Sequence, residues 1–243
     1  MALNTTTAEG ADVSSAQITT AMRLLQFGDS MLPVGAFSFS GALESAIQQG
    51  LVTDAETLGS YVRTSTRRAA TSDGVALLEA HRATKARQYD TLVEIDRAVF
   101  ARKLDDEFRV QTVRMGKKLL EVAGQVIGST VVHNHLGAVV DGGSPGTYPV
   151  SSGIVSAELG LSEEESFSLQ QYGVAAALLG AALRLMRIDH VTTQKILFDV
   201  NRLVGADFED VRSASVLDMS TFAPMADVLA AVHVQSHVRM FMS

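Results

Sequence analysis

Apolar residues recur every three or four positions along most of this chain, which is the spacing of one face of an α-helix. The run QQYGVAAALLGAALRLM at residues 170–186 is a clear example, because alanine and leucine dominate it. Both residues favour helices and are poor markers of strands. Proline, which interrupts helices, occurs only four times among 243 residues. The pattern therefore predicts an all-α fold, a single-domain helical bundle with little or no β-structure.

Two capping boxes predict where helices begin. Thr53–Glu56 fits one of them, with Thr53 as the N-cap, and Ser162–Glu165 fits the other. Three glutamates follow Ser162 in the first turn, where the helix dipole favours negative charge. Glycine and proline predict a loop over residues 137–149, and residues 126–135 are the only locally β-like run. Periodicity predicts further helices over residues 74–87, 92–104, 106–126 and 192–204, and a last one from Pro224.

The two ends of the chain differ from its middle. Residues 1–16 are small and polar without helical spacing, so we expect a disordered N-terminal tail. Residues 17–243 then form one all-α domain, in which the first helix ends near Gly28 and the C-terminal segment is mobile. The N-terminus lacks the basic and apolar blocks of a signal peptide, and the apolar run 173–183 is too short to span a bilayer of about 30 Å. We therefore expect a soluble, cytoplasmic protein without a membrane partner.

Charge and cysteine content exclude several classes of function. The net charge is −7, which disfavours binding to nucleic acid or to an anionic membrane surface. Cysteine is absent, so disulfides, thiol catalysis, iron–sulfur clusters and thiolate zinc sites are excluded. A metal ion would need histidine and carboxylate ligands.

The sequence contains no recognisable catalytic motif. Residues 142–147 are glycine-rich but lack the lysine of a P-loop. Neither Ser38 nor Ser40 has the Gly-x-Ser-x-Gly context of a nucleophile elbow, and helix N-capping is the favoured interpretation of both. Asp189 and His190 are more simply a loop between helices than an acid–base pair. We expect no enzymatic activity and no bound cofactor.

The histidines leave a metal site open at two places. His133 and His135 would share a face only in a strand, and no third ligand lies near them in sequence. His233 and His237 are one helical turn apart, so their rings could share a face, although a solvated terminal helix also explains them. The basic run 109–118 has few aromatic residues and is expected to be a solvated helix face.

The segment DSMLPVGAFSFSGALESAIQQG, residues 29–50, raises a separate question, because it matches no catalytic motif. It resembles the N-terminal signature of the urease accessory protein UreF family, Leu-Pro-x-Gly-x-Phe-Ser-Tyr-Ser followed by Gly-Leu-Glu. The residues that match are Leu32, Pro33, Gly35, Phe37, Ser38, Ser40, Leu43 and Glu44.

The second half of the chain is similar to the same family. Residues 148–166 match its Tyr-Pro-Val and Leu-Gly-Leu-x-Glu-Glu segments, Arg184 and Gln194 match a basic-Leu pair and a glutamine, and residues 220–243 resemble its C-terminus. The resemblance spans roughly residues 24–243. The sequence departs from the family's pattern at Phe39 (usually Tyr), Ala42 (Gly), Thr147 (His), His190 (Gln) and Val234 (Glu).

The resemblance implies an all-α protein that is not an enzyme and tends to form a homodimer. Members of the family join UreD (also called UreH), recruit the GTPase UreG and act on apo-urease so that nickel reaches its active site. It therefore implies a partner-binding surface rather than a catalytic site. We assign that surface to Pro33, Gly35, Phe37, Ser38, Phe39, Ser40, Glu44, His233, Arg239 and Phe241.

Alternatives remain open at this point. Phe37 and Phe39 can anchor a partner or belong to the core, and one ring inside with one outside is the compromise. A nickel-binding chaperone that uses His233 and His237 is the alternative function. An unrelated helical enzyme is a third, disfavoured because no acid, base and nucleophile converge.

Overall fold

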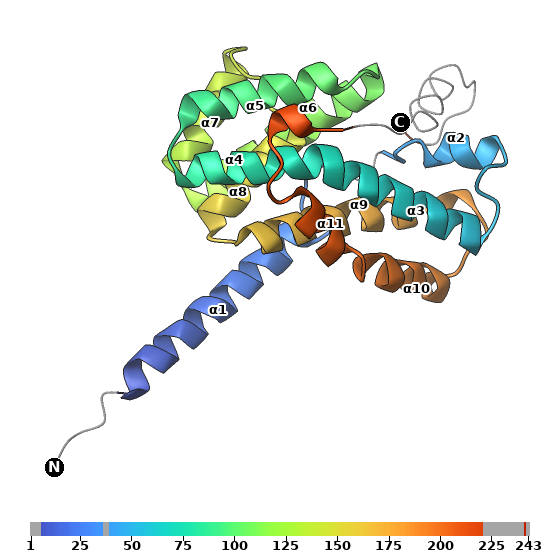
Figure 1. The fold of residues 1–243 in the computed structure, drawn as a ribbon, viewed down its shortest axis with the longest axis horizontal. Helices are drawn as coiled ribbons and strands as arrows, with labels where there is room; N and C mark the ends of the chain where they lie inside the picture. Colours follow the sequence, from blue (N-terminus) through green and yellow to red (C-terminus); the bar gives the residue numbers. More distant parts are fainter. Residues whose placement is uncertain (1–5, 36–38, 221–240, 242–243) are drawn as a thin grey trace.

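The computed structural model describes residues 6–35, 39–220 and 241, with side chains from residue 15 onward, as a bundle of α-helices without a strand among them (Figure 1). The predicted all-α fold is confirmed. No helix in this part of the chain is long and apolar enough to cross a membrane. The helices are α1 (Thr6–Gly28), α2 (Leu43–Gln48), α3 (Ala55–Ala69), α4 (Val75–Lys85), α5 (Tyr89–Arg102), α6 (Asp106–Ile127), α7 (Thr130–Val140), α8 (Tyr148–Leu159), α9 (Glu163–Leu185), α10 (His190–Asn201) and α11 (Val204–Val211).

Helix α8 lies at the centre of one half of the bundle. Helices α4 and α6 pack along it, and α5 and α7 complete this half. Nine of its twelve residues are buried, so it needs small residues where neighbouring backbones approach. Gly153 is such a position, since a Cβ added there would lie 2.5 Å from the carbonyl oxygen of Leu77 in α4.

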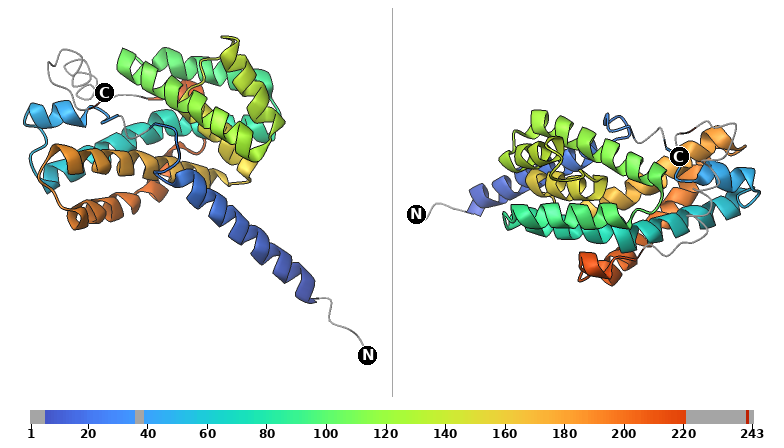
Figure 2. Two further views of the ribbon diagram at one scale, coloured as in Figure 1. Left: turned by 180° about the vertical axis from the view of Figure 1, so that it is seen from behind. Right: turned by 90° about the horizontal axis from the view of Figure 1, so that it is seen from above.

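The other half consists of α2, α3, α9 and α10 around a second apolar cluster. A π-helical turn, η2 (Ala70–Gly74), joins α3 to α4, so these helices form one long rod through both halves (Figures 1 and 2). A third cluster includes Phe167 of α9 and Phe208 of α11, whose rings meet edge to face at 5.5 Å between centroids. The two halves therefore share α9 and the α3–α4 rod.

Helix α1 extends away from the body of the bundle (Figures 1 and 2). Its C-terminal end is anchored, because Arg23 Nη1 donates to the Leu159 carbonyl at 2.9 Å and Phe27 is buried. Farther along, Ile18, Met22 and Leu25 have exposed fractions of 63%, 60% and 62%, so α1 presents an apolar stripe to solvent.

The start of α1 differs from the predicted N-terminal tail. The structure continues the helix to Thr6, so residues 6–16 are helical where disorder was expected. Ala8 and Ala11 are strong helix formers, and extending an existing helix avoids the cost of nucleating one. Residues 1–5 lie outside the described part of the chain.

Other boundaries also shift. The box at residues 162–165 is confirmed, but α3 begins one residue later than predicted, since Asp54 is its N-cap and Thr57 completes that box. The locally β-like run 126–135 contains no strand, in agreement with the predicted all-α fold. Gly128 ends α6 in the left-handed conformation, Ser129 caps α7, and the predicted loop shortens to residues 141–147. Single capping residues thus outweighed local strand propensity.

A buried carboxylate fixes that loop and the start of α8. Asp96 of α5 accepts hydrogen bonds from Ser144 Oγ (2.5 Å), Gly146 N (2.6 Å), Thr147 N (2.8 Å) and Thr147 Oγ1 (2.5 Å). His135 Nε2 lies 3.7 Å from its Oδ2. Thr147, which departs from the family's usual histidine, therefore supplies two of the donors.

Burial alone would raise the pKa of Asp96, but the nearby His135 imidazole and the hydrogen bonds from Ser144 and Thr147 outweigh it and lower the pKa. Because the pKa is lower in the folded state, the stabilisation is complete above the unfolded value of about 3.9 and is lost as the pH falls through the folded value.

We predict that Asp96→Asn lowers the free energy of unfolding at pH 7 by roughly 2–4 kcal/mol, because an amide cannot accept all these donors. Between pH 5 and pH 3 the variant should lose less stability than the wild type. Urea unfolding at several pH values measures both effects, with Asp90→Asn at an exposed position of α5 as the control. Parallel pH profiles for wild type and Asp96→Asn would contradict this role.

The turn before α2 contains two successive left-handed residues, Gly41 (φ +57°) and Ala42 (φ +63°). Ala42 is the N-cap residue of α2 and provides no side-chain cap. A left-handed alanine costs about 1–2 kcal/mol, because its Cβ crowds the following carbonyl. The family's usual glycine avoids that cost, so Ala42 is a strained position.

We predict that Ala42→Gly leaves stability nearly unchanged, while Ala46→Gly lowers it by about 1–2 kcal/mol more. Both substitutions remove one buried methyl group, but Ala46 belongs to the right-handed helix α2. Thermal or urea unfolding of the two variants gives the comparison. Equal losses would show that Ala42 is not strained.

Candidate partner-binding site

The N-terminal signature contributes both exposed and buried residues to the candidate site. Pro33 is exposed and Gly35 adopts a φ of +82°. Phe39 has an exposed fraction of 6% and joins the apolar cluster around α8, so this ring belongs to the core. The family's tyrosine hydroxyl would have entered a buried environment at this position. Phe37 and Ser38 lie outside the described residues.

The predicted N-capping role is wrong for Ser40. Its carbonyl oxygen accepts a hydrogen bond from Leu43 N at 3.1 Å, but the N-cap residue of α2 is Ala42. Ser40 is buried, which removes it from direct contact with a partner in this conformation.

Glu44 links the N-terminal signature to the C-terminus. It lies in the first turn of α2, as expected, but it is almost fully buried. Its Oε2 accepts a hydrogen bond at 3.1 Å from the backbone N–H of Phe241, 197 positions away in the sequence. Phe241 is itself buried in the second apolar cluster. The structure therefore brings together two of the residues assigned to the partner-binding surface from sequence.

A third group completes this contact. The guanidinium of Arg184, near the end of α9, lies over the Phe241 ring at 4.3 Å from its centroid. This is cation–π geometry. Arg184 matches the family pattern, but the sequence did not assign it to the site. Its spacing within α9 cannot reveal a ring near the end of the chain.

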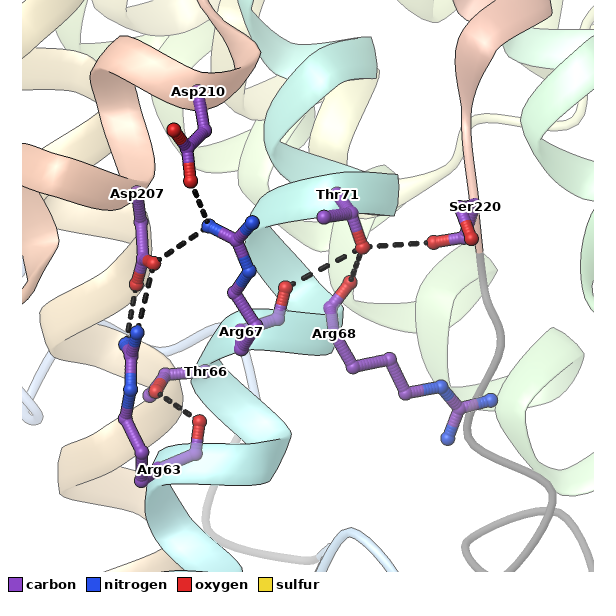
Figure 3. Close-up of polar contacts among 8 residues, drawn as sticks. All are labelled: Arg63, Thr66, Arg67, Arg68, Thr71, Asp207, Asp210 and Ser220. Carbon is purple, nitrogen blue, oxygen red and sulfur yellow. Dashed lines mark hydrogen bonds and ion pairs between the residues drawn. The ribbon is translucent and has the colours of Figure 1, made fainter.

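The segment preceding residue 221 is anchored near the same half of the molecule. Thr71 Oγ1 donates to the Ser220 carbonyl at 2.9 Å (Figure 3), and Ser220 N donates to the Thr71 carbonyl at 3.0 Å. Ser220 and Phe241, the two described residues that flank residues 221–240, are thus fixed on the α3–α4 rod and on α2. His233, Val234, His237 and Arg239 lie outside the described residues.

An ionic cluster holds α11 against α3 beside this anchor. Figure 3 shows buried Asp207 between Arg63 and Arg67, and Arg67 also reaches Asp210. Burial would raise the pKa of Asp207, but the hydrogen bonds from both arginines outweigh it and lower the pKa. Asp207 therefore stays ionised near neutral pH, and the cluster fixes the path of the chain toward Ser220.

The histidines that the structure describes do not form a metal site. His133 Nδ1 lies 2.7 Å from the Ser129 carbonyl, while His135 faces Asp96. Asp189 caps α10, and His190 is the first residue of that helix and is exposed, so neither forms an acid–base pair. Among the residues described, no three histidine or carboxylate side chains are grouped to hold a metal ion.

An apolar groove of about 1040 Å³ runs between α1 and α9. One side is formed by the end of α1, including Leu25, and the other by an α9 face with small residues. Gly173 and Gly180 leave this face open, because a Cβ at either position would meet nothing within 4 Å. Exposed Tyr172 borders the groove. The chain therefore offers a second surface on which another polypeptide could pack.

Comparison with known proteins identifies the family. The UreF family model matches residues 52–201. Urease accessory protein UreF 2 of Brucella canis is 52% identical over 222 residues, which cover 91% of each chain. Urease accessory protein UreF of Yersinia pseudotuberculosis serotype IB is 44% identical over 220 residues, covering 90% of this chain and 96% of that protein. This chain therefore belongs to the UreF family of urease accessory proteins.

Proposed function

We propose that this chain is a scaffold for urease maturation and not an enzyme. In this proposal it acts in the cytoplasm, joins UreD (UreH), recruits the GTPase UreG and promotes GTP-dependent insertion of nickel into apo-urease. The names of its relatives support the general role in urease maturation. The observation that carries the scaffold role is the convergence of Glu44, Arg184 and Phe241 from three distant segments.

The chemistry of that convergence suits protein recognition. Arginine and aromatic residues are enriched at protein interfaces, where their truncation in a desolvated contact costs the most binding free energy. Arg184 is exposed and Phe241 is buried beneath its guanidinium. In this proposal a partner contacts the exposed Arg184 guanidinium. The buried Phe241 ring and Glu44 hold that region of the surface in place.

The proposed homodimer would use the groove between α1 and α9. Its glycines permit close approach of a second helix, and its apolar lining favours burial. His233, Arg239 and the exposed part of the N-terminal signature complete the proposed partner-binding set. Nickel is the cargo in this proposal, and equilibrium dialysis with Ni²⁺ tests the alternative that His233 and His237 bind it directly.

We predict that Glu44→Ala lowers Tm by a few degrees, because it removes a buried acceptor of the Phe241 N–H. Capture of UreG by the complex with UreD should weaken roughly tenfold, which corresponds to about 1.4 kcal/mol of binding free energy. Co-purification of the tagged chain with UreD, UreG and apo-urease, followed by urease activation, measures this loss.

Glu94→Ala, which changes an exposed glutamate of α5, is the matched control and should behave as the wild type. Glu44→Gln retains an acceptor oxygen and separates charge from hydrogen bonding. A folded Glu44→Ala variant that captures UreG and activates urease as well as the wild type would refute the proposed role of this site.

A further inference from the structure

Tyr61 connects the α3–α4 rod to the turn that precedes Glu44. Its hydroxyl donates a hydrogen bond to the Gly41 carbonyl oxygen at 2.7 Å. Its ring packs against the second apolar cluster, which also contains Leu43 and Ala46 of α2. Burial raises the pKa of Tyr61 above its ordinary value, so the hydroxyl stays protonated and remains a donor throughout the neutral range.

The turn that Tyr61 holds is not stable by itself. Gly41 and Ala42 are both left-handed, and α2 is only six residues long without a side-chain N-cap. So short a helix cannot support its own geometry in water, because nucleation is unfavourable. The direction of α2 must therefore come from tertiary contacts, and the Tyr61 hydrogen bond acts on the carbonyl directly before the N-cap residue.

The direction of α2 sets the position of Glu44. Glu44 lies two residues after Ala42, and its Oε2 meets the Phe241 N–H at 3.1 Å. Hydrogen bonds weaken steeply when the donor and acceptor are misaligned, so a small rotation of α2 would break this contact. The Phe241 ring beneath Arg184 would then lose its backbone anchor.

We infer that Tyr61 is a positioning residue for the partner-binding site, acting through its hydroxyl on Gly41 to hold Glu44 against the backbone of Phe241. This inference rests on the proposed function of the Glu44 surface. Tyr61 lies in α3 and acts indirectly. Its hydroxyl holds the turn, the turn sets the direction of α2, and α2 places Glu44 against Phe241 beneath Arg184.

Tyr61→Phe tests the inference, because it removes the hydroxyl and keeps the ring. Amide hydrogen exchange should accelerate in the peptides that contain residues 41–46 and residue 241, while exchange in α8 stays unchanged. Capture of UreG should weaken about fivefold, the effect of losing one net hydrogen bond of about 1 kcal/mol. Tyr89→Phe, at an exposed tyrosine at the start of α5, is the matched control.

A double variant separates positioning from a general loss of stability. If Tyr61 acts through Glu44, Tyr61→Phe combined with Glu44→Ala should capture UreG no more weakly than Glu44→Ala alone. Additive losses would overturn the inference, and so would a Tyr61→Phe variant in which exchange accelerates across the whole bundle, because both point to a general structural role.

The outcomes distinguish the inference from the proposed function. Wild-type capture by Glu44→Ala would refute the function of the surface itself. Weak capture by Glu44→Ala together with wild-type capture and exchange in Tyr61→Phe would leave that function standing and overturn the role of Tyr61.

Discussion

The close approach of backbones around α8 is the constraint on which the rest of the structure depends. Gly153 brings α8 against the Leu77 carbonyl of α4, and Gly116 brings α6 against the backbone of Gly146 at the loop before α8. A Cβ at either glycine would collide with backbone atoms, which cannot move aside as a side chain can. Because protein interiors are packed near crystal density, the positions of α4 and α6 follow directly from these contacts.

Asp96 of α5 fixes the position of α8 along its axis by binding the loop that precedes it. An ionised carboxylate in a dry interior is costly unless its hydrogen bonds are satisfied. The donors at Ser144, Gly146 and Thr147 satisfy it, and in doing so they fix where α8 begins. The π-helical turn joins α4 to α3 without a break, so the position of α4 also sets the position of α3 in the other half of the bundle. Gly74 in that turn accommodates the ring of Phe167 of α9.

The candidate site lies on the half that the rod supports. Helix α2 is too short to hold its own direction, yet Glu44 must meet a backbone N–H within hydrogen-bonding distance. Contacts with α3 and α9, which are longer and well packed, fix the direction of α2. The ionic cluster of Asp207 with Arg63 and Arg67 holds α11 against α3, and α11 precedes Ser220 in the chain. In the candidate site, Glu44 is thus carried on a short helix whose position is set by longer, well-packed helices.

The sequence by itself determined many of the helices, because periodicity and caps act between residues three or four positions apart, but it did not predict α7, α8 or α11. Ser162 and Glu165 define the start of α9 in this way. Local signals conflicted at residues 126–135. The β-branched residues there favour a strand, whereas Gly128 and Ser129 end one helix and begin the next. The resemblance to the UreF family likewise rested on short motifs in order along the chain.

Tertiary structure decided which of those motifs meet. Nothing within a few residues of Glu44 indicates that it contacts Phe241, and nothing in the spacing of α9 indicates that Arg184 covers the same ring. Nor does sequence show that Phe39 is core, that Ala42 is left-handed or that Thr147 bonds to Asp96. These facts depend on packing between segments far apart in the chain. Local patterns specify which face of a helix is apolar, but the shape of the neighbouring backbone determines what that face contacts.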